Sequence, residues 1–393
     1  MRSERFVGFG FGPIQSALFV FEAIRSGNFQ SYVIAEIDSE LVQAMRDASG
    51  FYEINVAHAD KITKARLGPV QLLNPTVEKD RALLIEAIAD ADEIATALPS
   101  VEFYTLGGEL SVASLLAKGL QKSAKRHQRL IYTAENHNHA AEILGTAVAT
   151  AMGTSLPRET QFLNTVIGKM SGVINDEMEQ SRLGLGRLAP GISRAVLVEE
   201  FNRILISRVT LPGFRRGIEV FDEKSDLLPF EEAKLYGHNA THALLGYLAC
   251  KQGYRYMSDA GAELREFVRA AFLEESGTAL ISKYGGLDDL FTPVGFRAYA
   301  EDLLRRMVNP WLHDSVERVT RDPRRKLGWH DRLVGTMRLA LDACIKPERF
   351  AKGAAAAFEL LTRAQPGIRL EELWPEPDEP QGRKQALKKL LEA

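Results

Sequence analysis

A glycine-containing turn near the N-terminus constrains the fold of this chain more than any other segment. It consists of Gly10, Phe11, Gly12, Pro13 and Ile14. A strand-like run over residues 5–9 precedes it, a helical pattern over residues 14–25 follows it, and a second strand-like run covers residues 32–37. The first glycine permits a tight turn, and the second lets the backbone approach a pyrophosphate at the positive end of the helix. The segment therefore predicts a βαβ unit that binds a dinucleotide, although two glycines after a strand also occur in ordinary turns.

Four side chains near this turn or at strand ends bear on the cofactor. Gln15 occupies the place of the third glycine in the dinucleotide fingerprint, so either the helix lies farther from the strand or the amide reaches the cofactor. Glu36 ends the second strand, where a carboxylate accepts both ribose hydroxyls and repels a 2′-phosphate, although a strand-end acid can also be merely solvated. Thr96 and Ala97 end another predicted strand, at the edge where open sheets bind ligands. These residues predict a site for NAD rather than NADP.

Strand and helix patterns alternate along the first part of the chain, which is typical of a mostly parallel, doubly wound sheet. Further strand-like runs lie at residues 70–73, 93–97 and 130–133. Long amphipathic helical patterns dominate the later part, and the glycine-rich residues 183–191 are the best candidate for the connection. A chain of 393 residues also exceeds the usual size of a single core. We therefore predict an α/β fold, with a Rossmann-type domain over residues 1–190 and a mostly α-helical domain over residues 191–393.

The charge of the chain argues against two classes of partner. Its 49 basic and 52 acidic residues give a formal net charge of -3, so it has no positive surplus for nucleic acid or an anionic membrane. Only two cysteines occur, Cys250 and Cys344, and Glu22 and Arg25 soon interrupt the apolar stretch near the N-terminus. We therefore expect a cytoplasmic protein whose partner is a small molecule.

A helical segment in the second half contains three residues suited to alcohol oxidation, Lys234, Asn239 and His242. Helical spacing places Asn239 and His242 on nearly one side, with Lys234 within reach of the same cleft. A lysine that is partly desolvated near a positively charged nicotinamide can lose its proton and act as a base. The asparagine amide and the histidine ring can donate to the developing alkoxide or carbonyl oxygen. The segment therefore predicts a site for hydride transfer.

A zinc site is the alternative interpretation of this segment. His238 and His242 are four residues apart, as in a metalloprotease pair, but Asn239 replaces the glutamate of that motif and no third ligand is evident. His137 and His139 lie in a polar run, where histidines are more often solvated than bound to metal. We therefore expect no metal ion.

Several short motifs accompany the Lys234, Asn239 and His242 spacing. They lie at residues 133–136, 243–248, 274–277, 283–285, 309–312, 316–319, 325–327 and 331–333. Through this combination, which extends to about residue 360, the chain resembles the polyol-specific long-chain dehydrogenases of the mannitol dehydrogenase family.

The resemblance implies metal-independent hydride transfer with NAD by a monomer, in a cleft between a Rossmann domain and a helical domain. It implies that Lys234 is the general base, that Asn164 and Asn239 bind the oxyanion, and that His242 bonds the substrate oxygen. It also assigns Asn136 to the cofactor site.

A basic cluster is the candidate substrate site. It comprises Arg318, Arg321, Arg324, Arg325 and Lys326. Of these, Arg318 and Lys326 match family positions that contact the sugar. Arginines and lysines at this density can hold a phosphate, although a basic helix end can also be simply solvated. The main prediction is therefore the interconversion of a hexitol phosphate and a ketose phosphate, with an unphosphorylated polyol or sugar acid as the alternative substrate.

Three departures from the family pattern leave alternatives open. Gln15 replaces a glycine, and Gly168 and Lys169 replace the usual aspartate and arginine, which removes an anchoring ion pair. The residues 204–208 lack the acid that relatives tend to have there. A sensor that binds NAD without turnover therefore remains a further alternative, although Lys234 and its partners are intact.

Overall fold

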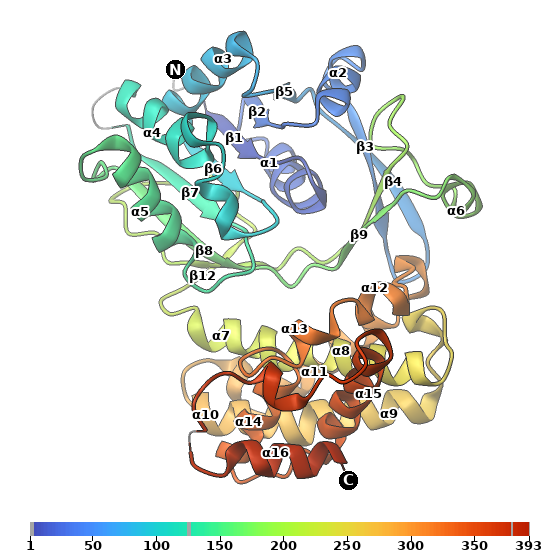
Figure 1. Ribbon diagram of the computed structural model, residues 1–393. Helices are drawn as coiled ribbons and strands as arrows, with labels where there is room; N and C mark the ends of the chain where they lie inside the picture. Colours follow the sequence, from blue (N-terminus) through green and yellow to red (C-terminus); the bar gives the residue numbers. More distant parts are fainter. Residues whose placement is uncertain (1–3, 124–126, 379, 393) are drawn as a thin grey trace. The chain divides into compact units, whose positions relative to one another are not determined.

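The chain forms two compact units in the computed structural model, which describes residues 4–123, 127–378 and 380–392 (Figure 1). The first unit comprises residues 1–227 and the second comprises residues 228–393. The sequence-based boundary was residue 190, but residues 191–227 contribute strands to the sheets of the first unit. Residues 197–199, for example, pair with residues 55–57, which are far away along the chain, and a local pattern does not show such pairing.

The first unit contains the predicted α/β layer. Within the described residues, a sheet of eight strands has the order β12-β11-β8-β7-β6-β1-β2-β5. All of its neighbouring strands are parallel except β8 and β11. The strands are β1 (Arg5–Phe9), β2 (Ser31–Ala35), β5 (Gln71–Leu73), β6 (Glu93–Thr96), β7 (Arg129–Thr133), β8 (Thr160–Val166), β11 (Leu205–Ser207) and β12 (Asp222–Lys224). The prediction of a mostly parallel, doubly wound sheet is confirmed.

A second sheet in this unit was not predicted. In the part of the chain that the structure describes, it has the order β4-β3-β10-β9. Its strands are β3 (Tyr52–Ala57), β4 (Ile62–Leu67), β9 (Ser171–Ile174) and β10 (Ala195–Glu199). The buried amide of Asn55 donates to the carbonyls of Gly186 and Val196, which joins strands from distant parts of the sequence.

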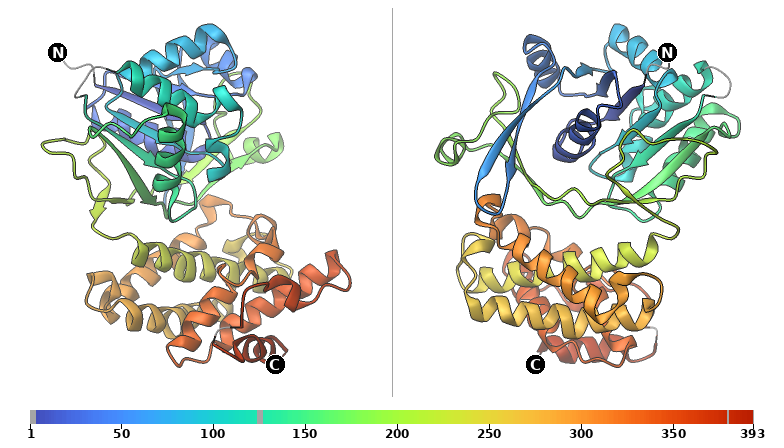
Figure 2. Two further views of the ribbon diagram at one scale, coloured as in Figure 1. Left: turned by 60° about the vertical axis from the view of Figure 1, so that its left-hand side comes forward. Right: turned by 180° about the vertical axis from the view of Figure 1, so that it is seen from behind.

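Each face of the large sheet has its own hydrophobic core. Val7 and Phe9 of β1 face a core that α3 (Glu78–Ala89), α4 (Val112–Lys122) and α5 (Ala140–Met152) help to form. Phe6 faces the other core. This core is covered by a π-helical turn, η1 (Gln15–Phe19), which continues as α1 (Val20–Ser26). The second sheet contributes Ile54 and Val196 to the same core. Figures 1 and 2 show α3, α4 and α5 on one side of the sheet and α1 on the other. The alternation along β1 thus gives a strand buried on both faces.

Two further helices complete the first unit. Helix α2 (Ser39–Asp47) follows β2, and α6 (Glu177–Leu183) follows β9.

The described part of the second unit is mostly helical, as predicted (Figure 2). Its longer elements are α7 (Leu228–Glu232), the π-helix η4 (Ala233–Asn239), α8 (Ala240–Lys251), α9 (Ala262–Ala270), the π-helix η6 (Ala271–Gly277), α10 (Thr278–Tyr284), α11 (Pro293–Met307), α12 (Val316–Thr320), α13 (Pro323–Lys326), α14 (Val334–Asp342), α15 (Glu348–Ala364) and α16 (Arg383–Glu392). The described chain contains no helix with both the length and the apolar character needed to cross a bilayer.

Close contacts between helices depend on glycine. A Cβ on Gly246 of α8 would lie 2.5 Å from Val319 of α12, and one on Gly353 of α15 would lie 2.4 Å from Leu244. Both positions let a neighbouring helix approach closely, since even one methylene disturbs a packed interior. Trp374 is buried, and its indole donates to the carbonyl of Leu327 at 2.9 Å.

Candidate active site

The predicted glycine turn lies between β1 and η1. Gly10 has a φ of 79°, and a Cβ there would lie 2.9 Å from the carbonyl oxygen of Ala97. A Cβ on Gly12, in contrast, would meet nothing within 4 Å. Gly10 is therefore required by the turn itself, whereas Gly12 keeps open the space in front of the helix N-terminus.

The Glu36 carboxylate spans this turn and the end of β2. One of its oxygens accepts a hydrogen bond from the amide of Phe11 at 2.7 Å, and the other accepts from the amide of Asp38 at 2.9 Å. Each carboxylate oxygen has a second lone pair that can accept from a hydroxyl. The carboxylate is thus held in a fixed position at the rim of the pocket described next.

A pocket of about 750 Å³ lies at the carboxyl edge of the sheet in the first unit. Seven of the predicted cofactor residues line it, namely Gly10, Phe11, Gly12, Pro13, Ile14, Glu36 and Ala97. Four exposed apolar side chains also line it, Ile37, Phe103, Leu106 and Leu110. Exposed apolar groups gathered around one hollow are typical of a binding site for a flat aromatic ring. The pocket therefore fits the adenosine half of a dinucleotide, which the glycine turn and Glu36 alone could not establish.

Gln15 lies behind the turn rather than in the pocket. The residue is fully buried, and neither polar atom of its side chain has a hydrogen-bond partner in the described structure. Its amide occupies the space next to Gly8 of β1, since a Cβ on Gly8 would lie 2.0 Å from its Nε2. A glycine on the strand thus makes room for the side chain that replaces the third glycine of the helix.

A buried carboxylate that we did not predict organises the loops beside the pocket. Glu135 accepts hydrogen bonds from the Thr96 hydroxyl and the Leu98 amide, both at 2.9 Å, and from the Tyr104 hydroxyl. Burial raises the pKa of Glu135 despite these donors. Thr96 therefore acts behind the pocket wall by holding Glu135, and Asn136 is exposed next to it.

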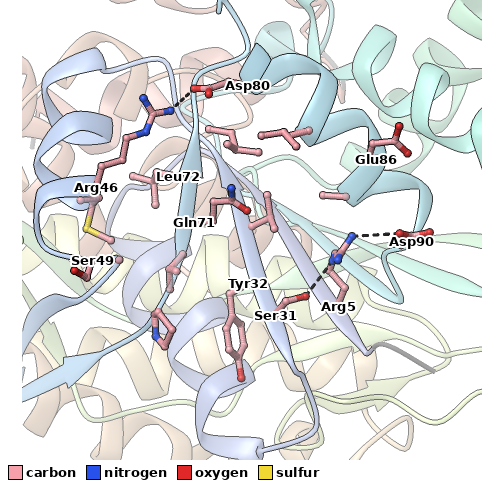
Figure 3. A pocket seen from close by; sticks show the side chains of 18 of the residues that line it. Arg5, Ser31, Tyr32, Arg46, Ser49, Gln71, Leu72, Asp80, Glu86 and Asp90 are labelled. Carbon is pink, nitrogen blue, oxygen red and sulfur yellow. Dashed lines mark hydrogen bonds and ion pairs between the residues drawn. The ribbon is translucent and has the colours of Figure 1, made fainter. Parts of the chain in front are cut away.

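A larger hollow of about 1060 Å³ lies along the edge strand β5 (Figure 3). Its charged groups are mostly paired with each other: Arg46 binds Asp80, and Arg5 binds Asp90 at 3.4 Å and Ser31 at 3.0 Å. It contains none of the predicted site residues.

Lys234 and Asn239 lie on the π-helix η4 at the start of the second unit. Backbone hydrogen bonds of a π-helix join residues five apart, so these two residues stand one turn from each other. The Tyr236 carbonyl accepts from the hydroxyls of Ser276 at 2.7 Å and Thr336 at 3.1 Å, which satisfies a backbone group within the widened turn. The π-turn therefore brings the candidate base and an amide closer than α-helical spacing would.

The electrostatic surroundings of Lys234 favour its neutral form. Burial, together with the positive charge of Arg332, lowers the pKa of Lys234 to about 8. Burial and the neighbouring basic side chains also lower the pKa of His238 well below its usual value. A lysine whose pKa is lowered in this way can accept a proton closer to neutral pH than an ordinary lysine can, and its role as the base stays a prediction.

His242 contacts a carboxylate that the sequence analysis did not single out. Its Nε2 lies 2.8 Å from Oδ2 of Asp314, and Oδ1 of Asp314 accepts from Nε of Arg318 at 2.8 Å. The amide of Asn239 and Nδ1 of His242 make no side-chain hydrogen bond within the described residues. Two of the predicted residues, His242 and Arg318, are thus joined through Asp314.

The rest of the basic cluster is divided between buried and exposed groups. Lys326 is buried, its amine donates to the Arg321 carbonyl, and burial with nearby arginines lowers its pKa to about 8. Arg325 is exposed and bonds to Asp322 at 2.9 Å, and the side chain of Arg321 is also exposed. Arg324 is exposed as well, so the cluster offers three exposed arginines rather than five free cations.

Asn164 lies at the carboxyl end of β8 in the first unit, beside Thr133 of β7. Its carbonyl accepts from the Ala141 amide at 2.8 Å, and its amide donates to Glu142 at 2.9 Å. Asn164 therefore contacts the N-terminus of α5, and its role in oxygen binding stays a prediction.

Lys169, which departs from the family pattern, has a structural role. Its buried amine donates to the carbonyls of Glu199 and Phe201 and to the side chain of Asn202. It thereby anchors the segment after β10, in place of the ion pair that the sequence lacks.

The two histidine pairs are the candidate metal ligands of the sequence. Among the residues that the structure describes, no group of three or more histidine, cysteine or acidic side chains is placed to hold a metal ion. The rings of His238 and His242 lie with their centroids 6.3 Å apart.

Residues 226–390 match the family model of the mannitol dehydrogenase C-terminal domain. This segment is therefore similar to the C-terminal domain of the mannitol dehydrogenases. The match contains Lys234, Asn239, His242 and Asp314, so the side chains described for the second unit all lie within it.

Relatives of known name extend the resemblance to most of the chain. A mannitol-1-phosphate 5-dehydrogenase from Bacillus licheniformis is 29% identical over 333 residues, which are 83% of this chain and 80% of the relative. A protein of the same name from Exiguobacterium sibiricum is 29% identical over 354 residues, or 90% of this chain and 84% of the relative. The resemblance to the mannitol dehydrogenase family is therefore confirmed.

Two solved structures share the fold. A D-sorbitol dehydrogenase superposes with a TM-score of 0.72 at 15% identity, over 91% of this chain and 81% of that one. A mannitol 2-dehydrogenase from Pseudomonas fluorescens, solved with NAD and D-mannitol, superposes with a TM-score of 0.68 at 16% identity, over 99% of this chain and 84% of that one. They confirm the predicted fold class.

Proposed function

We propose that this chain is an NAD-dependent dehydrogenase that interconverts a secondary alcohol of a hexitol phosphate and the matching ketose phosphate. The observation that carries the proposal is Lys234, which has a pKa of about 8 and stands one π-turn from Asn239 in a segment similar to the mannitol dehydrogenase C-terminal domain. The names of the relatives, mannitol-1-phosphate 5-dehydrogenases, support the choice of substrate class.

NAD is the proposed cofactor, and the first unit contains the residues suited to hold it. Glu36 would accept the ribose hydroxyls of the adenosine half, and the open space at Gly12 would admit the pyrophosphate. Ile37 follows Glu36 where a cation would be needed to attract a 2′-phosphate, which supports NAD over NADP. When bound, the nicotinamide supplies the acceptor for the hydride.

The chain's own groups account for the proton and the developing charge. In the direction of oxidation, neutral Lys234 accepts the hydroxyl proton of the substrate while the C–H hydrogen leaves with its electron pair, and a C=O bond forms. The amide of Asn239 donates to the oxygen as negative charge grows on it. Lys234 then releases its proton to water. The products are a ketose phosphate, NADH and one proton, and the balance requires no metal ion.

A dehydrogenase of an unphosphorylated polyol or sugar acid is the second candidate. The observation that favours it is the number of cluster cations that already have partners: Arg318 bonds to Asp314, Arg325 to Asp322 and Lys326 to the Arg321 carbonyl. Replacing Arg321, Arg324 and Arg325 by glutamine separates the two candidates. The KM for a phosphorylated ketose rises in the first case, and KM values are unchanged in the second.

The test of the proposed function is NADH consumption with fructose 6-phosphate, fructose and other ketoses and keto acids, repeated with NADPH. Lys234→Ala should abolish turnover while NADH still binds. Lys346→Ala is the matched control, since this lysine is on the surface of the same unit with a side chain 70% exposed. Absence of turnover with every substrate, combined with normal NADH binding, would refute the proposal in favour of an NAD-binding sensor.

A further inference from the structure

Asp314 is a buried carboxylate located between two predicted site residues. Its side chain is 2% exposed, and that of His242 is 15% exposed. Oδ2 lies 2.8 Å from Nε2 of His242, and Oδ1 lies 2.7 Å from Nη2 and 2.8 Å from Nε of Arg318. Each oxygen of the carboxylate therefore has a different partner.

The backbone around Asp314 is fixed by neighbouring segments. The Met257 amide donates to the Asp314 carbonyl at 2.9 Å, and the Val316 amide donates to the Arg255 carbonyl at 2.9 Å. The Ser315 hydroxyl accepts from the Arg318 amide at the start of α12. Gly246 lets α12 approach α8, the helix that contains His242. The carboxylate is thus held in place by the fold before any substrate binds.

Charge determines which groups can donate in this arrangement. Burial alone would raise the pKa of Asp314, but its interactions with His242 and Arg318, including the hydrogen bonds that both side chains donate, lower it below the usual value. An ionised carboxylate only accepts hydrogen bonds, so the ring nitrogen that faces it must bear a hydrogen. In a neutral imidazole, the second nitrogen then has a free lone pair and no hydrogen.

We propose that Asp314 is a positioning residue that holds His242 with its hydrogen on Nε2, so that Nδ1 accepts a hydrogen bond from a hydroxyl group of the substrate. This inference rests on the proposed function, and it changes the role expected for His242 from donor on the reacting oxygen to acceptor for a neighbouring hydroxyl. The site would then select polyols that have a hydroxyl beside the reacting carbon. The same carboxylate orients Arg318, so one group sets the direction of two side chains.

The first test is the state of the His242 ring, which can be observed without any substrate. A two-bond proton–nitrogen correlation spectrum of the ¹⁵N-labelled full chain distinguishes the two neutral forms and the charged form, with His242→Asn used to assign the signals. We expect a hydrogen on Nε2 and none on Nδ1. A hydrogen on Nδ1, or on both nitrogens at the pH of highest activity, would overturn the inference.

Asp314→Asn is the informative variant. Arg318 has only donors, so the asparagine oxygen would turn to it and the asparagine NH₂ group would face Nε2 of His242. The ring would then have its hydrogen on Nδ1, and the spectrum should change accordingly. Asp342→Asn is the matched control, because Asp342 also bonds to an arginine, Arg383 at 2.7 Å, but is 57% exposed. It should leave the spectrum of His242 unchanged.

The second test is kinetic and compares a polyol with its analogue that lacks the hydroxyl beside the reacting carbon. In the natural chain, loss of this hydroxyl should lower kcat/KM about ten- to hundredfold, the range for a lost buried hydrogen bond. In Asp314→Asn, loss of this hydroxyl should change kcat/KM little, because Nδ1 of His242 would bear a hydrogen there and could not accept a hydrogen bond. An equal effect in both proteins, with an unchanged ring spectrum, would mean that Asp314 has only a structural role. If the natural chain turns over no substrate, the proposed function fails, while the spectrum still decides the state of His242.

Discussion

Replacement of the buried Gln15 by methionine should stabilise the first unit. The side chain is fully buried, and its Nε2 and Oε1 have no partner among the described residues. An unsatisfied buried polar group costs about 1–3 kcal/mol, and methionine keeps the unbranched shape without the amide. We therefore expect Gln15→Met to raise the free energy of unfolding by about 1–3 kcal/mol. For a unit of this size, each kcal/mol corresponds to an increase in Tm of about 2–4 °C.

Differential scanning calorimetry of the full chain measures this change. The transition of the first unit is the one that NADH shifts upwards, since a ligand stabilises the unit that binds it. Gln43→Met, on the surface of α2, is the matched control and should change stability by less than about 0.5 kcal/mol. A loss of stability in Gln15→Met would show that the amide has a partner, and a large fall in NADH affinity would show that it reaches the cofactor. Either result refutes the reasoning.

Three further predictions concern the base, the glycine turn and the packing of α8. Because the pKa of Lys234 is lowered to about 8, kcat/KM for alcohol oxidation should rise as the pH increases through about 8. The kcat/KM for ketose reduction should fall over the same pH range. Profiles of kcat/KM against pH in both directions check this. Gly12→Ala should weaken NADH binding in titrations but leave Tm nearly unchanged. Gly10→Ala should instead lower Tm, because Gly10 has a φ of 79° and a Cβ there would contact Ala97. Gly246→Ala should destabilise the second unit by about 1–3 kcal/mol in denaturant titrations, because its Cβ would lie 2.5 Å from Val319. An unchanged midpoint would contradict the last prediction.

The parts of the fold that local patterns describe were predictable. The βαβ unit around Gly10 and the helical character of the second unit follow from apolar periodicity and turn residues, and both are present. The second sheet was not predictable, because β10 pairs with β3, which is distant in the sequence. Asn55 also interrupts the apolar pattern of β3, and its reason for being buried is visible only once Gly186 and Val196 lie beside it.

The candidate site was likewise predictable only in part. Residue chemistry was enough to single out Lys234, Asn239 and Glu36. The π-turn that relates Lys234 to Asn239 was not predictable, because a widened turn has no distinct composition. Asp314 was also missed, because nothing in the sequence shows that it meets His242 from seventy-two positions away. Asp314 precedes the short helix α12 by two residues, and its spacing of four from Arg318 was the one local signal that could have drawn attention to it.

Glu36 has a consequence for attempts to change the cofactor. Its carboxylate is at once the group proposed to recognise the ribose and the acceptor for the amides of Phe11 and Asp38. A substitution chosen to admit a 2′-phosphate would therefore also release two backbone donors and loosen the glycine turn. Cofactor choice and turn geometry therefore depend on the same side chain. A variant redesigned to bind NADP would need a new hydrogen-bond acceptor for these two backbone amides.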